Sequence, residues 1–319
     1  MQKRPLGRSG LETAPLVFGG NVFGWTVDRD RSFALLDSFV DAGFNAIDTA
    51  DVYSRWVPDN KGGESETIIG EWLKARGRRD DVLILTKVGS PMGQHSDDRK
   101  DLTAGWIERA VEDSLRRLQT DVIDLYQSHW EDPDTPQEET LRAYDRLIQA
   151  GKVRAIGVSN HSAEATAEGL AVSEREGLPR YETLQPHYNL YSRSTFEGPL
   201  QDLAVDKGLG VITYYSLESG FLSGKYRTAE EAAGTTRGAG LADRFDERGM
   251  RILATLRGVA ERNAATPAQV SLAWLLTRPG VTAPIVSATS LEQLADTLKA
   301  AQLTLSAEDV AELTEASEA

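Results

Sequence analysis

The sequence alternates short apolar runs with amphipathic segments of helical period, and this alternation constrains the fold more than any other feature. Eight runs have the length and apolar composition of buried strands, at residues 15–18, 45–48, 82–87, 122–127, 155–159, 182–186, 210–215 and 284–287. Helices are expected at residues 31–42, 103–118, 135–150, 162–176, 196–207, 250–263, 267–277 and 291–301. Eight strand–helix units in one chain are typical of a closed (β/α)8 barrel, the TIM barrel.

An open, doubly wound parallel sheet is the competing architecture. The units are evenly spread and no linker divides the chain, which favours the barrel. A length of 319 residues would otherwise suggest about two domains, but α/β barrels of this size commonly form one. We therefore expect a single barrel domain over residues 1–319. Two short extended pieces flank "GRSG" within residues 3–13, and they predict an N-terminal β-hairpin that plugs the bottom of the barrel.

Two connections are long and polar, at residues 89–102 and 219–249. Long loops in compact domains are usually functional or mobile. In a barrel both would lie at the C-terminal face, where active sites form. The second connection, rich in Gly, Thr and charge, is called the flap below, because we expect it to order over a bound cofactor.

Composition excludes several classes of protein. No run of 18 apolar residues exists, so no transmembrane helix is expected, and "MQKRPLGRSG" lacks the apolar region of a secretory signal, which favours the cytoplasm. The net charge of −14 argues against nucleic acid or anionic membrane as a partner. Cysteine is absent, and the four His show no HxH or HExxH spacing, so we expect no metal and disfavour a metal-assisted barrel hydrolase.

Polar residues gather where the predicted strands end, which is where a barrel carries its catalytic groups. Each of them has a structural explanation when taken alone: Lys87 could snorkel to water, His129 could be a hydrogen-bonded core residue, and Tyr53 could serve packing. Their joint placement at one face favours a site. The set is Asp48, Tyr53, Lys87, His129, Ser159, Asn160, Gln185, Tyr214 and Ser287.

The chemistry of this set is coherent. A buried Lys87 beside Tyr53 would stabilise the phenolate and lower the tyrosine pKa from its usual value of about 10, and Asp48 would keep the lysine charged. A neutral His129 could orient a carbonyl. A tyrosine acid suits reduction of a carbonyl to an alcohol, which needs a hydride-donating cofactor. The chain has neither GxGxxG nor GxxxxGK[ST], so a nicotinamide cofactor would have to bind at the barrel mouth.

Five ordered motifs then resemble the aldo-keto reductase family: "NAIDTADVYS" (45–54), "LILTKVG" (83–89), "LYQSHW" (125–130), "AIGVSN" (155–160) and "GFLSGKY" (220–226). The likeness covers nearly the whole chain and is greatest to bacterial members similar to potassium-channel β-subunits. It implies NADPH-dependent reduction of aldehydes or ketones to alcohols in a TIM barrel. The channel-β likeness leaves a second hypothesis open, a non-catalytic subunit that senses NADP(H).

The resemblance also implies roles for individual residues. Tyr53 would be the general acid, tuned by Lys87 and Asp48, and His129 would orient the carbonyl. The cofactor would contact Asp48 and the residues that match the family's binding motifs, namely Gly20, Asn21, Ser159, Asn160, Gln185, Tyr214, Leu217, Ser219, Lys225, Ser287, Thr289, Gln293 and Asp296. The substrate pocket would be lined by Trp25, Tyr53, Trp56, His129, Trp130 and the 89–102 loop.

The sequence departs from the family pattern at four positions. Ser287 stands where Gly is frequent, Thr289 where many members have an Arg that grips the 2′-phosphate, Thr297 where Asn is common and Ser216 where Pro is common. The resemblance still implies NADPH, with NADH as a further option because that Arg is missing. The partner expected is a small carbonyl compound, whose identity the sequence leaves open along with the oligomeric state.

Overall fold

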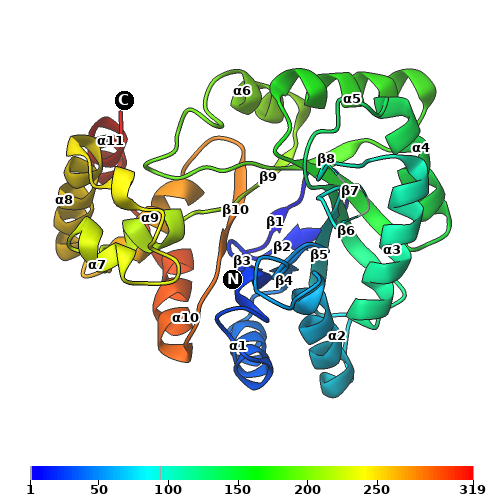
Figure 1. Cartoon of the computed structure of the whole chain (residues 1–319). Helices are drawn as coiled ribbons and strands as arrows, with labels where there is room; N and C mark the ends of the chain where they lie inside the picture. The colour runs from blue at the N-terminus through cyan, green and yellow to red at the C-terminus, as the bar shows by residue number, and fades with distance from the viewer. Residues whose placement is uncertain (1, 94, 96, 319) are drawn as a thin grey trace.

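Eight parallel strands close into a barrel in the computed structural model, which describes residues 2–93, 95 and 97–318. The strands follow one another around the ring in the order β10-β3-β4-β5-β6-β7-β8-β9 (Figure 1). All eight predicted strands are found, with some ends shifted by one to three residues, and the closed ring rules out the open sheet. They are β3 (Val17–Gly19), β4 (Ala46–Asp48), β5 (Leu83–Val88), β6 (Ile123–Ser128), β7 (Val153–Ser159), β8 (Tyr181–Gln185), β9 (Gly210–Thr213) and β10 (Val281–Val286).

Helices surround this barrel, most of them packed directly on its strands. Those that correspond to predicted segments are α1 (Arg29–Asp41), α3 (Ala104–Leu118), α4 (Gln137–Gln149), α5 (Ala163–Glu176), α6 (Pro199–Lys207), α8 (Glu247–Arg262), α9 (Pro267–Leu276) and α10 (Leu291–Leu298). Three were not predicted: α2 (Glu64–Arg76), α7 (Ala229–Ala233) and α11 (Ala307–Ala316).

Helix α2 follows β4 and gives a weak sequence signal because its N-cap is a glycine without a side-chain hydrogen bond and because Gly70 interrupts its centre. That glycine serves packing, since a Cβ there would lie 2.1 Å from the backbone oxygen of Arg117 at the end of α3. A small residue at this point lets the two helices approach closely, although it lowers helix propensity.

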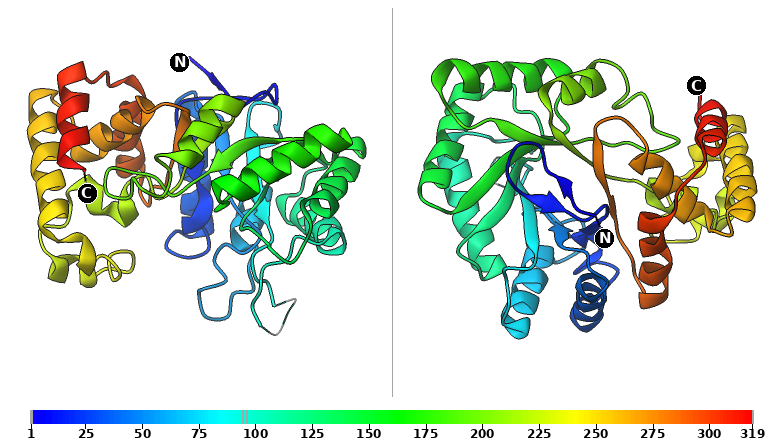
Figure 2. Two further views of the ribbon diagram at one scale, coloured as in Figure 1. Left: turned by 90° about the horizontal axis from the view of Figure 1, so that it is seen from above. Right: turned by 180° about the vertical axis from the view of Figure 1, so that it is seen from behind.

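Helix α8 does not cover the barrel directly, which corrects the simple prediction of one barrel helix at residues 250–263. It packs against α9 and α11 at one side of the ring, and α9 packs on β10 (Figures 1 and 2). The flap leads into this group. It is not structureless, because it contains the short helix α7, the 3-10 turn η3 (Ala242–Arg244) and the start of α8.

The N-terminal hairpin closes the bottom of the barrel, as predicted (Figure 2). It consists of β1 (Arg4–Pro5) and β2 (Glu12–Thr13), and its Leu6 and Leu11 pack with the inward-facing apolar side chains of the barrel strands. Arg4 donates to the backbone oxygen of Thr282, near the start of β10. The opposite end of the barrel, where the strands terminate, therefore remains free to carry a site.

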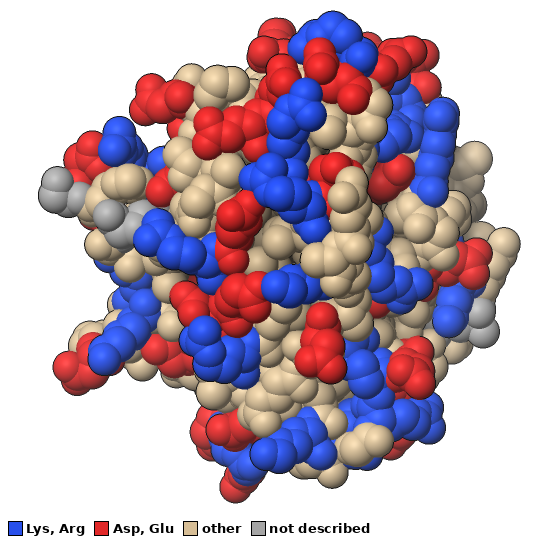
Figure 3. Space-filling view, turned by 90° about the vertical axis from the view of Figure 1, so that its right-hand side faces the viewer, with Lys and Arg blue, Asp and Glu red and all other residues tan. Residues whose placement is uncertain are grey.

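Acidic and basic side chains are interspersed on the face formed by α3, α4 and α5 (Figure 3). Several of them pair between helices, for example Arg146 with Glu108 at 2.7 Å and Arg142 with Glu176 at 3.3 Å. These exposed pairs stabilise the fold only slightly, because water screens them. Within the described part of the chain, no helix has the length and apolar character needed to cross a membrane.

Candidate active site

The ends of β4 and β5 bring a lysine, an aspartate and a tyrosine into contact. Lys87 is completely buried, which excludes a surface lysine that reaches water. Its Nζ donates to both carboxylate oxygens of Asp48 at 2.9 and 2.7 Å, to the Thr49 backbone oxygen at 2.8 Å, and to the Tyr53 hydroxyl at 3.0 Å. The Tyr53 hydroxyl also approaches Asp48 Oδ2 at 3.4 Å. The phenol oxygen of Tyr53 is therefore hydrogen-bonded directly to the lysine ammonium.

Burial sets the protonation of this group. Burial raises the pKa of Tyr53 well above its ordinary value, and the Asp48 carboxylate raises it further. The expected lowering by Lys87 is thus wrong, because burial disfavours the charged phenolate and the Asp48 carboxylate offsets the lysine charge. Burial lowers the pKa of Lys87 more than Asp48 raises it. The phenol is therefore held neutral, with its proton in place.

His129 follows β6 and lies beside Tyr53, with the two ring centres 6.0 Å apart. Its Nδ1 is hydrogen-bonded to Ser90 Oγ at 2.9 Å. Burial lowers the pKa of His129 well below its ordinary value, and the charge of Lys87 adds to this effect. A neutral imidazole with one nitrogen engaged by Ser90 leaves Nε2 as the nitrogen that can face a ligand.

An elongated cleft of about 1330 Å³ crosses the barrel mouth and begins at this group. Trp56 and Trp130 flank its open end and are 49% and 39% exposed. Ser90, Pro91 and Asp98 of the predicted pocket loop also line it, and residues 94 and 96 of that loop lie outside the described residues. The end near Tyr53 is therefore aromatic and open to solvent.

Hydrogen bonds between strand ends build the floor of the cleft. Gln185 donates to Asp48 Oδ1 at 2.8 Å, and Ser159 donates to the Gln185 backbone oxygen at 2.9 Å. The Asn160 amide donates to the backbone oxygen of His129 at 2.8 Å and accepts from the Tyr214 hydroxyl at 2.6 Å. These four residues come from the ends of β7, β8 and β9, and they surround the same part of the cleft, as predicted.

The far end of the cleft is lined by the turn after β9, by β10 and by α10. Ser287 donates to Asn21 Oδ1 at 2.7 Å, which ties β10 to the turn after β3. Thr289 donates to Gln293 Oε1 at 2.9 Å, so this hydroxyl is already used. The remaining predicted cofactor residues here also line the cleft, namely Leu217, Ser219, Lys225 and Asp296.

Two predicted contacts do not line the cleft. Gly20 packs beneath it, where its backbone oxygen accepts from Ser65 Oγ at 2.8 Å. Trp25 packs edge-on against Trp56, with ring centres 5.6 Å apart, and so supports the pocket wall from behind. Both lie in the turn after β3, from which Asn21 and Thr26 line the cleft, together with Gly19 at the end of β3.

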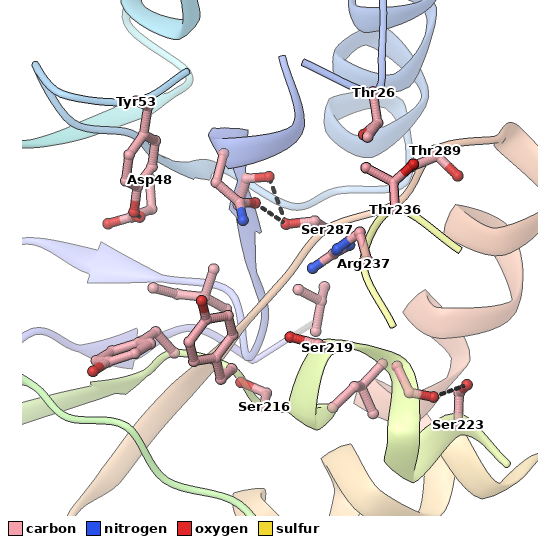
Figure 4. Close-up of a pocket in the computed structure, with 18 of the residues that line it drawn as sticks. Thr26, Asp48, Tyr53, Ser216, Ser219, Ser223, Thr236, Arg237, Ser287 and Thr289 are labelled. Atoms are coloured by element: carbon pink, nitrogen blue, oxygen red, sulfur yellow. Dashed lines mark hydrogen bonds between the residues drawn. The ribbon is translucent and has the colours of Figure 1, made fainter. Parts of the chain in front are cut away.

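Sequence reasoning missed Arg237 of the flap. Its side chain is half-buried in the cleft wall and reaches between Ser287 and Ser219 (Figure 4). Burial lowers the pKa of this guanidinium, and no hydrogen bond or ion pair to another described residue is found for it. Partial burial of a cation without a partner costs free energy, which an anionic ligand would offset. Its position in "GTTRGAG", an Arg among Gly and Thr within a predicted flap, was the available signal.

Fold and cleft together define a (β/α)8 barrel protein with its site at the C-terminal face. Residues 15–318 match the sequence model of the "Aldo/keto reductase family". The chain is 36% identical over 312 residues to "Uncharacterized oxidoreductase YrpG" of Bacillus subtilis (strain 168), covering 97% of this chain and 93% of that protein. It is 32% identical over 344 residues to "Protein tas" of Escherichia coli (strain K12), with 98% and 96% covered. The chain belongs to the aldo/keto reductase family, and this membership supports an oxidoreductase activity.

A third relative has a different kind of name. The chain is 34% identical over 307 residues to "Probable voltage-gated potassium channel subunit beta" of Oryza sativa subsp. japonica, with 94% of this chain and 91% of that protein covered. The family therefore includes proteins named for an enzymatic role and proteins named for a channel, and the family alone does not decide between them.

Proposed function

We propose that the protein is an NADPH-dependent oxidoreductase that reduces aldehydes or ketones to alcohols. The observation that carries this proposal is the hydrogen-bonded set of Tyr53, Lys87 and Asp48 at one end of an elongated cleft. A neutral, partly buried phenol beside an aromatic pocket is suited to give a proton to a carbonyl oxygen.

The cleft fits a dinucleotide by the chemistry of its lining. The cleft lining includes an aromatic platform, Tyr214, and two cations, Lys225 and Arg237. Arg237 lies beside Ser287 at the far end (Figure 4). The buried Thr26 Oγ1 in the cleft wall has no hydrogen-bond partner among the described residues. These are the groups that a nicotinamide ring, a pyrophosphate and a phosphorylated ribose require. A bound reduced nicotinamide would supply the hydride that the carbonyl carbon needs, since no side chain can donate one.

The chain's own residues then handle the proton and the orientation of the substrate. His129 Nε2 and the Tyr53 hydroxyl would hold the carbonyl oxygen, and the phenol proton would pass to that oxygen as it gains charge. Lys87, at 3.0 Å from the phenol oxygen, would stabilise the phenolate that remains. Asp48 and Gln185 would keep the lysine charged and fixed. Trp56 and Trp130 would line a permissive aromatic pocket for the small carbonyl compound.

The NADPH preference gains support from Arg237, which the sequence argument lacked. The hydroxyl groups of Ser287 and Thr289 are both hydrogen-bonded to other residues, so they alone would bind a 2′-phosphate weakly. A guanidinium without a protein partner can bind a phosphate through charge-assisted hydrogen bonds. NADH remains the weaker alternative. A cytoplasmic location stays a prediction from sequence.

A non-catalytic subunit that senses NADP(H) is the second candidate function, and the relatives named as potassium-channel β-subunits favour it. Both candidates require nucleotide binding, so binding alone does not separate them. Steady-state turnover does. We expect the protein to consume NADPH with 4-nitrobenzaldehyde as test substrate and to form the alcohol. Tight NADPH binding without turnover over a panel of aldehydes and ketones would favour the sensor.

A further inference from the structure

A strained turn after β9 borders the cleft on the side of the flap. Three residues that are not glycine, Tyr215, Glu218 and Ser219, adopt φ values of 51°, 43° and 53°, and Gly220 follows with φ of 97°. Left-handed backbone is unfavourable for such residues and persists only where the surroundings enforce it. The turn therefore has to be held by contacts outside itself.

Glu218 provides those contacts. Its side chain is only 6% exposed, and its Oε2 lies 2.9 Å from His187 Nε2 and accepts from Asn189 Nδ2 at 2.6 Å and from Ser192 Oγ at 3.3 Å. Its other oxygen, Oε1, accepts from Arg244 Nε at 2.8 Å. These hydrogen bonds lower the pKa of Glu218 to about 2 against the effect of burial, so the carboxylate stays ionised. Because four donors bind one buried carboxylate, substitution of Glu218 would leave buried donors without an acceptor and lower stability.

The partners of Glu218 lie in two directions. On one side, the His187 ring stacks on Tyr214, with centres 5.4 Å apart and planes at 26°. Tyr214 in turn lines the cleft near Tyr53. On the other side, Arg244 belongs to η3 within the flap, and its guanidinium also lies over the ring of Tyr191 at 5.0 Å. Glu218 is thus one connection between the platform in the cleft and the flap that carries Arg237.

We propose that Glu218 is a positioning residue that holds Tyr214, through His187, and the flap, through Arg244, in a single arrangement that binds both ends of the cofactor. The proposal rests on the proposed function, because it assigns Tyr214 to the nicotinamide end and Arg237 to the phosphate end. It predicts that the two arms of Glu218, which are its contact with His187 and its contact with Arg244, can be separated by mutation. His187 acts on the nicotinamide end alone, Arg244 acts on the phosphate end alone, and Glu218 acts on both.

The test uses two binding probes and no turnover. Calorimetry with 2′,5′-ADP reports on the phosphate end, because this probe lacks nicotinamide, and the fluorescence of bound NADPH reports on the surroundings of the nicotinamide ring. Glu218→Gln keeps the shape but replaces one acceptor oxygen by an amide donor. We expect it to weaken 2′,5′-ADP binding by about 10-fold, the scale of a lost hydrogen bond to a charged group, and to change the NADPH emission.

The single-arm variants complete the design. Arg244→Met should weaken 2′,5′-ADP binding while the NADPH emission stays as in the wild type. His187→Phe keeps a ring against Tyr214 but loses the link to Glu218, so it should change only the emission. Arg142→Met, which removes an exposed ion pair on α4, is the matched control and should change neither. If Glu218→Gln does not melt cooperatively, the two single-arm variants carry the test.

Two results would overturn the proposal. The first is a folded Glu218→Gln variant with wild-type values for both probes. The second is that Arg244→Met and His187→Phe each change both signals or each change neither. A merely structural role would give such a result, because it does not separate the nicotinamide end from the phosphate end. If wild-type protein binds neither probe, the proposed function fails together with this inference, whereas wild-type binding with an unchanged Glu218→Gln variant overturns this inference alone.

Discussion

The two sides of the cleft are built in different ways. On one side, Asp48 and Lys87 stand at the ends of paired strands, and the register of β4 and β5 brings them together. On the other side, Arg237 and Arg244 belong to the flap. Turns join its short helices, the edge-on packing of Phe245 against Phe221 holds two of its segments together, and contacts such as the ion pair of Arg244 with Glu218 attach it. Strand ends place chemical groups rigidly, whereas a long connection places binding groups that can respond to a ligand.

Rate and affinity should therefore respond to different variants. Replacement of Tyr53 or Lys87 should lower turnover and leave nucleotide binding nearly intact. Changes in the flap should do the reverse.

The largest effect should come from Lys87→Met. Loss of the ammonium removes the group at 3.0 Å from the Tyr53 hydroxyl that would stabilise the phenolate, and we expect turnover to fall by about 10³-fold. The variant also leaves Asp48 buried without its partner, which lowers stability. The double variant Asp48→Asn/Lys87→Met removes both charges and should recover the melting temperature without recovering activity. Full activity in either protein would place the lysine outside the chemistry.

A smaller effect, on binding, should follow from Arg237→Met. Charge-assisted hydrogen bonds contribute about 1.5–3 kcal/mol, so the dissociation constant of NADPH should rise by about 10-fold or more while that of NADH changes little. Rising salt should weaken the NADPH preference of the wild type and have less effect on the variant. The matched control is Arg227→Met, an exposed flap arginine outside the cleft lining. An unchanged NADPH to NADH ratio in Arg237→Met would show that another group reads the phosphate.

Limited proteolysis should show a further, several-fold effect of NADPH on the flap. Trypsin can cleave after Arg227, which is exposed in the structure. Bound nucleotide should stabilise the flap in the arrangement that lines the cleft and so slow this cleavage, because ligand binding stabilises the state that binds it. Cleavage at an exposed site outside the flap serves as the internal control. Identical rates at Arg227 with and without saturating NADPH would contradict a flap that orders on binding.

The smallest predicted effect concerns stability beneath the strand ends. Asp51 is buried, and neither of its carboxylate oxygens has a hydrogen-bond partner among the described residues. Burial raises its pKa well above the ordinary value, and Glu66 adds to this rise. Because the pKa of this carboxyl is higher in the folded than in the unfolded protein, the folded state is favoured at low pH, where the carboxyl is protonated. This stabilisation is lost as the pH rises through the folded-state pKa.

Asp51→Asn cannot ionise, so it should gain stability relative to the wild type as the pH rises. Melting temperatures measured from acidic to alkaline pH should diverge by about 2–4 °C, with the variant higher at alkaline pH. Asp98→Asn, at an exposed position, should follow the wild type throughout. Parallel curves for Asp51→Asn would mean that its carboxyl does not titrate differently in the folded state.

The sequence predicted the barrel and the strand-end set well, for a physical reason. Buried parallel strands read as apolar runs, and their C-terminal ends must meet at one face, so Asp48, Lys87 and Asn160 could be placed together without a structure. Helix α2 was missed because a close approach to α3 requires Gly70, which breaks the helical signal. That residues 1–319 form one domain stays a prediction.

The flap side could not be predicted in the same way. The positions of Arg237 and Glu218 depend on turns with left-handed backbone and on ion pairs between segments that are distant in the sequence, and no local period encodes these. The tyrosine pKa was also predicted with the wrong sign. Residue types indicated a lysine beside a phenol, but the degree of burial and the balancing carboxylate decide the direction of the shift.

Tyr53→Phe, measured in two ways on one preparation, tests most directly whether Tyr53, Lys87 and Asp48 perform the chemistry while other residues of the cleft bind the nucleotide. Turnover of 4-nitrobenzaldehyde with NADPH should fall by about 10²-fold or more, because the ring remains and the proton donor is lost. The dissociation constant of NADPH should stay within about twofold of the wild type. Near wild-type turnover in this variant, or a parallel loss of NADPH affinity, would contradict the account.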